Sequence, residues 1–381
     1  MKKKKKTKKG LLKSIYKDCD STLLIVLTVI LTFGIIMCFS ASAPAAQSQV
    51  GNSYHFVKRQ IGWVFLGLIA MTVTTAIDCN FYRKHSGKLL VASILLTSLT
   101  LMMPAVNGAK RWLGVGSLGI QPSEMIKITM IIYFADQLSK QKWSKRANSL
   151  AEFGVNYFFD FGKYVFVLGL ICVILLLQPH LSCTILICSV AAVLFLVGGV
   201  KWSYLISSGS VALTALVAFA LSKGYTLERL QSYRDPFKYA RDEGYQIVQS
   251  FYAIGSGGLF GLGIGQSRQK FLYIPEPQND FIFSIICEEL GFLGALSVIL
   301  LFGILIYRGI VIALNAKDTY RALIAVGITT LITVQVFVNI GVVTGLLPVT
   351  GMALPFFSYG GSSLVFMLAS MGILLNISKN H

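Results

Sequence analysis

The chain has 381 residues, of which 55% are hydrophobic and only 13% are charged. Soluble domains carry about 25% charged residues, so this composition excludes a soluble globular protein and indicates a membrane protein. The formal net charge is +18, but much of the excess is a lysine block within residues 2–9, before the first apolar run. Such a block keeps a first span's N-terminus in the cytoplasm and attracts anionic lipids. We therefore expect a membrane surface as partner and no nucleic acid.

Ten apolar runs follow, each near the ~20 residues that cross a bilayer as a helix. They predict an all-α, polytopic membrane protein with about ten transmembrane helices. The predicted spans are 22–42, 60–78, 88–105, 122–138, 164–179, 181–200, 202–221, 281–306, 321–343 and 356–377.

The topology follows from the distribution of lysine and arginine. With the N-terminus inside, these residues gather in the predicted cytoplasmic connections, and an even number of spans returns the C-terminus to the cytoplasm. We expect a multi-pass protein of the cytoplasmic membrane, with residues 1–20 as a basic cytoplasmic segment and residues 21–381 as a single transmembrane domain. The seven cysteines lack CxxC spacing, so they predict neither a disulfide framework nor a metal site.

The segment between the third and fourth spans carries Lys110, Arg111 and Trp112. Two cations and an amphipathic ring at the membrane interface suit a diphosphate, but they equally suit plain anchoring among lipid headgroups.

The fourth span begins near Pro122, and Glu124 and Lys127 follow three residues apart on one helix face. An ionisable pair inside a span is costly and should face the bundle interior. It indicates either a structural ion pair at a helix end or one wall of a polar cavity.

The longest connection, 222–280, is predicted as a large extracytoplasmic loop between spans 7 and 8. It carries the cations Arg234 and Lys270, and five of the nine residues from Gly257 to Gly265 are glycine. Such a run either lets the backbone cradle an anion or forms a flexible re-entrant loop.

Asp280 is the last charged residue of this connection before a long apolar span. A carboxylate there loses part of its hydration, which makes it a stronger base. An aspartate at a helix N-terminus is also a common cap, and the residues alone leave both roles open.

The last connection contains proline and paired glycines, which indicate a broken helix whose freed backbone groups line a cavity. Ser358 and Tyr359 in this stretch would hydrogen-bond a sugar or a phosphate, or would serve helix packing through small residues.

Together these stretches resemble the shape, elongation, division and sporulation family of bacterial membrane proteins, the FtsW/RodA/SpoVE group. The similarity runs through nearly the whole chain from about residue 20, and the turn after the first span is more similar to the FtsW/SpoVE branch. The motifs that carry it are Asn107-Gly108-Ala109-Lys110-Arg111-Trp112, Gln121-Pro122-Ser123-Glu124, Ala253-Ile254-Gly255-Ser256-Gly257-Gly258, Pro275-Glu276 with Asp280-Phe281-Ile282-Phe283, Glu288-Glu289-Leu290-Gly291, and Leu354-Pro355-Phe356 with Ser358-Tyr359-Gly360-Gly361-Ser362-Ser363.

The resemblance implies a peptidoglycan glycosyltransferase that polymerises lipid II, an undecaprenyl-diphosphate-linked disaccharide-peptide, at the outer face of the membrane. It also implies a class B penicillin-binding protein and other division or sporulation proteins as partners. The family's essential aspartate falls on Asp280 and its functional tryptophan on Trp112. The expected substrate-binding residues are Lys110, Arg111, Trp112, Glu124, Lys127, Arg234, Lys270, Ser358 and Tyr359.

One position departs from the family pattern. The fifth span of the family ends in Gln-Pro-Asp-Leu-Gly-Thr, whereas this chain has His180 and Ser182 in place of the aspartate and the glycine. This departure keeps open the alternative of a non-catalytic scaffold for a penicillin-binding protein. The broken helices and intramembrane charges keep open a second alternative, a lipid II flippase. A divalent cation, Mg²⁺ or Mn²⁺, would help to balance the diphosphate, but no residue pattern demands one.

Overall fold

The computed structural model describes residues 15–105, 110–114, 119–143, 150–222, 231–242, 244–271 and 273–379. These residues are mainly helical and include no β-strand, only an isolated bridge between Leu113 and Ile120. The all-α prediction is confirmed. The helices are α2 (Ser21–Val50), α3 (His55–Ala76), α4 (Cys79–Leu99) with the 3₁₀ turn η1 (Thr100–Met102), α5 (Pro122–Lys140), α6 (Leu150–Asp160), α7 (Gly162–Leu177), α8 (Leu181–Val197), α9 (Trp202–Ser222), α11 (Tyr245–Gly257), α12 (Ile282–Leu314), α13 (Thr319–Val343) and α14 (Gly361–Ser378).

Each predicted span coincides with a helix, although several bounds differ. Helix α2 continues to Val50 and α12 continues to Leu314, beyond the ends of the apolar runs that predicted the first and the eighth span. Within the described ranges, six helices are long and apolar enough to cross a membrane, and α6 with α7, bent by 65°, would make a seventh. The count of ten stays a prediction, since α8 is short and α5 carries four charged residues.

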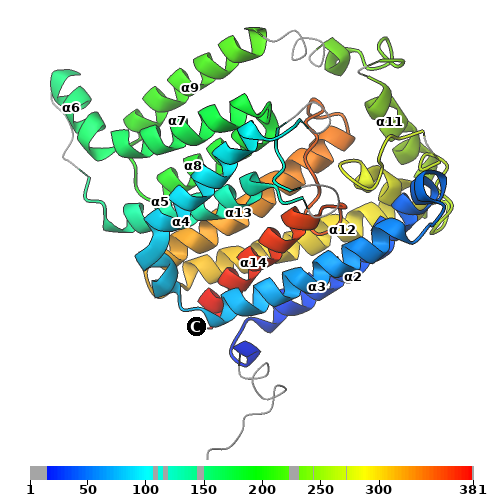
Figure 1. The fold of residues 1–381 in the computed structure, drawn as a ribbon, viewed down its shortest axis with the longest axis horizontal. Coiled ribbons are helices and arrows are strands. Elements are labelled where there is room, and N and C mark those ends of the chain that lie inside the picture. The colour runs from blue at the N-terminus through cyan, green and yellow to red at the C-terminus, as the bar shows by residue number, and fades with distance from the viewer. Residues whose placement is uncertain are drawn as a thin grey trace, which may run out of the picture.

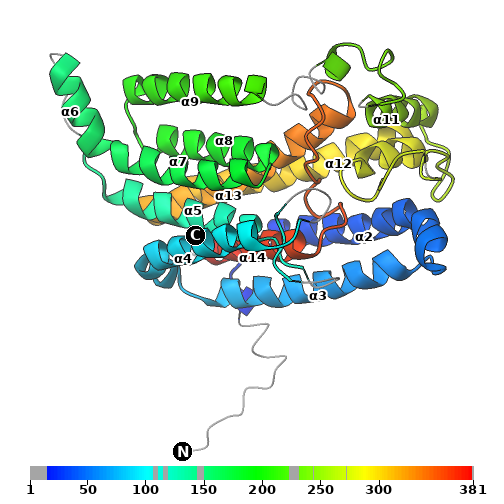
Figure 2. The ribbon, with the colours of Figure 1, turned by 45° about the horizontal axis from the view of Figure 1, so that its top comes forward.

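The first and last described helices meet at one end of the bundle. The Asp20 N–H donates to Ser378 Oγ (3.0 Å), and the Asp20 carboxylate pairs with Arg308 of α12. Lys379 Nζ donates to the Thr75 carbonyl at the end of α3 (2.7 Å). We name this the terminal end. The starts of α5, α12 and α14 lie at the other end, named the cavity end (Figures 1 and 2).

A break in α12 receives part of the long connection. At Gly291 the backbone has φ +63°, and the neighbouring carbonyls of Glu288 and Glu289 accept from the N–H groups of Leu262 and Gly263, both at 2.9 Å. The segment therefore satisfies backbone groups that the helix leaves open, which is how irregular chain is tolerated at membrane depth.

The glycines of this segment are required by close backbone contact. A Cβ on Gly257 would lie 1.9 Å from the Cys287 carbonyl oxygen, and one on Gly261 would lie 2.2 Å from that of Glu289. The glycine run thus lets its backbone approach α12 closely, and the N–H groups of Leu262 and Gly263 are already used there.

Candidate active site

A polar cavity of about 220 Å³ lies at the cavity end. It is enclosed by the first turns of α5, α8 and α14, the segment before α5, a face of α13 and the connection before α14. The residues that line it include Arg111, Trp112, Gln121, Glu124, Lys127, His180, Ser182, Gln335, Gly351, Met352, Tyr359, Ser362 and Ser363.

The expected ion pair of α5 forms one wall of the cavity. Pro122 occupies the first turn of α5, where its missing N–H costs nothing. Lys127 Nζ then lies 2.7 Å from Glu124 Oε2, and both side chains are almost completely buried. Ser363 Oγ of α14 donates to the same carboxylate oxygen (3.0 Å). The pair therefore joins α5 to α14 while its charges face the cavity.

Arg111 is held by backbone groups at the junction of α7 and α8. Its Nε donates to the Gln178 carbonyl (3.1 Å), and its Nη2 donates to the Pro179 carbonyl. Two hydrogen bonds between Leu113 and Ile120, each 2.8 Å, hold this segment beside the start of α5. The arrangement fixes the guanidinium and the neighbouring Trp112 ring at the cavity.

Asp280 lies just before α12, next to the cavity wall. A Cβ built on Gly351, which lines the cavity, would lie 3.6 Å from Asp280 Oδ2. The buried side chain of Asn339 donates through Nδ2 to the carbonyls of both Asp280 and Met352, at 2.7 Å each. Asn339 of α13 thereby fixes the half-buried aspartate against the connection that forms this wall.

The structure gathers some of the predicted site residues and separates others. Arg111, Trp112, Glu124, Lys127 and Tyr359 line the cavity, with Asp280 at its edge.

The remaining predicted residues lie outside the cavity lining. Lys110 and Arg234 are exposed, and neither lines this cavity. Ser358 is buried in a turn, where its Oγ accepts from the Leu354 N–H (2.8 Å). Lys270 belongs to a different part of the bundle.

That part is a buried cluster that we name the anchor cluster: Ser40, Ser267, Lys270, Glu288 and Glu289. Lys270 Nζ lies 2.7 Å from Glu289 Oε1, and both side chains are almost completely buried. Ser40 Oγ donates to Glu289 at 2.7 Å, and the Arg268 N–H donates to Glu288 at 2.9 Å. The cluster joins the long connection to α12 and α2.

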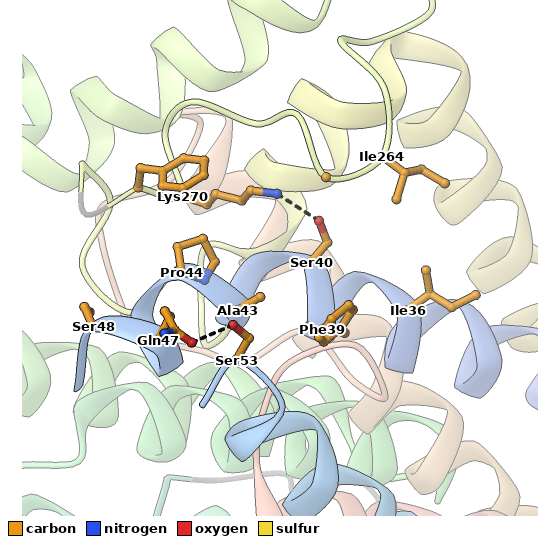
Figure 3. A pocket seen from close by; sticks show the side chains of 12 residues that line it. Ile36, Phe39, Ser40, Ala43, Pro44, Gln47, Ser48, Ser53, Ile264 and Lys270 are labelled. Atoms are coloured by element: carbon orange, nitrogen blue, oxygen red, sulfur yellow. Dashed lines mark hydrogen bonds between the residues drawn. The ribbon is translucent and has the colours of Figure 1, made fainter. Parts of the chain in front are cut away.

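A second, more open cavity of about 810 Å³ lies beside the anchor cluster. Its walls are largely apolar residues of α2, such as Phe39 and Pro44, facing Ile264 and Phe271 of the long connection. Figure 3 shows Lys270 pointing across it toward Ser40, 3.2 Å away. Lys270 is therefore placed at this second cavity, next to its glutamate partner.

Gln335 is a cavity residue that was not predicted. It is buried in α13 and lines the cavity, and its Oε1 has no hydrogen-bond partner among the residues that the structure describes. An amide inside the apolar run 321–343 is costly in lipid, so this residue and Asn339 could have been noticed as polar side chains facing the bundle interior.

His180 is an uncharged member of the cavity lining. Burial, together with the positive charges of Arg111 and Lys127, lowers the pKa of this imidazole to about 3. It lies between α7 and α8, and its carbonyl accepts from the Thr184 N–H (3.1 Å). Its ring is therefore neutral at physiological pH.

Over the described ranges, no group of three or more His, Cys, Asp or Glu side chains is arranged to hold a metal ion. The described residues therefore offer no cluster of this kind as ligands for Mg²⁺ or Mn²⁺.

Comparisons with known proteins identify the family of this chain. The model of the FtsW/RodA/SpoVE family, described as cell cycle proteins, matches residues 20–381. The chain belongs to this family. It is 43% identical to stage V sporulation protein E of Bacillus subtilis over 367 residues, covering 94% of this chain and 97% of that protein. It is 37% identical to a probable peptidoglycan glycosyltransferase FtsW of a Geobacter species, covering 94% and 96%.

Two solved structures share the fold of this family member over nearly its whole length. One is a chain of a peptidoglycan synthase complex that coordinates polymerization and crosslinking, with a TM-score of 0.77, 28% identity, and coverage of 94% of this chain and 97% of that one. The other is the rod shape determining protein RodA of Thermus thermophilus, with a TM-score of 0.68, 27% identity, and coverage of 94% and 96%. Both place the bundle among multi-pass membrane proteins.

Proposed function

We propose that the protein is a peptidoglycan glycosyltransferase that polymerises lipid II into glycan strands for cell division or sporulation. The observation that carries the proposal is the position of Asp280 beside a cavity that also holds Arg111 and Lys127. Family relatives that bear the glycosyltransferase name support it, as does the likeness to a chain of a peptidoglycan synthase complex.

The terminal end of the bundle faces the cytoplasm in this proposal. Arg83, Arg308, Arg321 and Lys379 gather near that end, as expected for connections on the positive, cytoplasmic side. Both termini are then cytoplasmic, and the cavity end opens at the outer face, where lipid II is used.

The reaction is a glycosyl transfer in which one lipid-linked sugar is the acceptor and the lipid-linked growing strand is the donor. Asp280 accepts the proton of the GlcNAc 4-hydroxyl as that oxygen attacks the anomeric carbon of the growing strand. The bond from that carbon to the diphosphate breaks, and undecaprenyl diphosphate leaves with the electron pair. Arg111 and Lys127 stabilise the negative charge that develops on the leaving group. A divalent cation bound by the diphosphate would supply further positive charge.

The partner in this proposal is a class B penicillin-binding protein, together with other division or sporulation proteins. A glycosyltransferase releases linear glycan, so a second enzyme must crosslink it. The related complex that coordinates polymerization and crosslinking supports such a pairing.

The decisive test is polymerisation of lipid II by the purified full-length protein with its partner. Asp280→Asn keeps the shape but removes the base, and we expect at least a thousandfold loss of glycan formation. Asp242→Asn is the matched control, because Asp242 is exposed in the long connection and lines neither cavity. Wild-type rates in the Asp280→Asn variant would refute the mechanism. Partner binding by wild-type protein without any polymerisation would identify a scaffold instead.

A further inference from the structure

His180 differs from the ionised residues of the cavity lining, Arg111, Glu124 and Lys127, because its ring carries no charge. Arg111 and Lys127 are cations, and Glu124 is already paired with Lys127 at 2.7 Å. Tyr359 also lines the cavity, and Asp280 lies at its edge. In this surrounding a neutral imidazole adds hydrogen-bonding capacity without adding negative charge.

The environment of the ring selects one tautomer. Nδ1 is buried and has no hydrogen-bond partner within the described part of the chain. A buried N–H without an acceptor is rarer in proteins than a buried acceptor without a donor, so the proton is better placed on Nε2. The ring makes no hydrogen bond within the described part of the chain, and Nε2 is not among the buried atoms that lack a partner. Because His180 lines the cavity, we infer that Nε2 is the nitrogen that a ligand there can reach. The ring therefore presents an N–H donor to a ligand.

The depressed pKa of His180 agrees with this geometry. Burial and the cations Arg111 and Lys127 lower it to about 3, so the ring stays neutral between pH 5 and 8. The donor is consequently present at all physiological pH values, and it does not depend on protonation.

We propose that His180 is a substrate-binding residue whose Nε2–H donates a hydrogen bond to a diphosphate oxygen of the lipid-linked substrate. The inference rests on the glycosyltransferase proposal and names a residue of that same site. An aspartate at this position would offer only acceptors and would add a third carboxylate to Glu124 and Asp280. With histidine, the cavity retains more positive charge and one more donor for an anionic ligand.

The first measurement is the affinity of the full-length protein for undecaprenyl diphosphate, in nanodiscs, with uncharged undecaprenol as the control lipid. A hydrogen bond to a charged group contributes about 1.5–3 kcal/mol, so we expect His180→Asp to weaken diphosphate binding at least tenfold. His180→Gln retains a neutral donor and should stay within threefold of the wild type. Binding of undecaprenol should be the same in all three proteins.

The second measurement separates a binding role from a purely structural one. His180→Asp should raise the KM for lipid II at least tenfold while kcat falls less than threefold. The affinity ratio between wild type and His180→Gln should stay constant from pH 5 to 8, because the imidazole does not titrate there.

Equal binding by wild type and His180→Asp would overturn the proposal, as would equal losses in the Asp and Gln variants. A ratio that rises below pH 6.5 would also overturn it, since a charged imidazole would then be responsible. If the wild type binds the diphosphate but forms no glycan, the glycosyltransferase proposal fails while the role of His180 in binding stands.

Discussion

Two buried ion pairs of the same chemistry lie in different surroundings. Glu124 and Lys127 face each other across 2.7 Å, as do Glu289 and Lys270. The first pair lines a polar cavity, so its charges are available to a ligand. In the second, Glu289 also accepts hydrogen bonds from Ser40 and from the Ser267 N–H. The second pair is thus occupied with joining the long connection to α12 and α2.

The comparison teaches that an intramembrane charge pair does not by itself mark a binding site. What distinguishes the two is the carboxylate: Glu124 itself lines its cavity, whereas Glu289 is enclosed by its donors and only Lys270 of that pair reaches the second cavity. We therefore assign the Glu124–Lys127 pair to function. We assign the Glu289–Lys270 pair to holding the long connection on α12, and the difference can be tested.

The largest effect is expected at the anchor cluster. Lys270→Met leaves Glu289 as a buried, uncompensated charge, which typically costs about 3–5 kcal/mol. We expect a pronounced fall in thermal unfolding temperature, with activity lost together with folded protein. The exposed Lys142→Met is the matched control and should leave both unchanged. The double variant Lys270→Met/Glu289→Gln should recover most of the stability and also activity, because the charge requirement there is structural.

A smaller loss of stability is expected at the cavity pair. Lys127→Met leaves Glu124 with the Ser363 hydroxyl and with space for water beside it, so we expect about 1–3 kcal/mol of destabilisation. Glycan formation should fall at least tenfold even when the amount of folded protein is matched. The double variant Lys127→Met/Glu124→Gln should recover stability without recovering activity. Recovery of both would show that the two pairs do not differ in role.

The joint between the glycine run and α12 is tested by the difference in stability between two glycine variants. Gly261 and Gly265 have similar φ values, +82° and +84°, but a Cβ would meet the Glu289 carbonyl only at Gly261. Both alanine variants carry the penalty of left-handed backbone, about 1–2 kcal/mol. Gly261→Ala should lose about 2 kcal/mol more, because the segment must move away from α12. Equal unfolding temperatures for the two variants would contradict the joint seen in the structure.

The smallest effect is a pH dependence of stability at His180. Its pKa is about 3 in the folded protein and about 6.5 when unfolded, so between these values the unfolded chain binds more protons. Stability should therefore fall as the pH decreases from 7 to 5, by about 1–2 kcal/mol. His180→Gln removes this contribution, and thermal unfolding of both proteins across this range measures it. An identical pH response in the two proteins would mean that the imidazole is not buried as described.

The local features of this protein were determined by the sequence. Apolar runs of membrane length predicted the helices, because a helix in lipid must satisfy its own backbone. The three-residue spacing of Glu124 and Lys127 predicted their pairing, and the position of Asp280 before an apolar run predicted its place at the start of α12. These predictions depend only on the geometry of a single helix.

Tertiary structure decided which distant residues meet. Lys270 looked like a cavity cation, but the packing of its connection onto α12 gives it Glu289 as partner. His180, between α7 and α8, and Gln335 of α13 meet the Glu124–Lys127 pair only in the assembled bundle. Spacing along one helix fixes neighbours three or four residues apart, whereas contacts between helices depend on how all of them pack together.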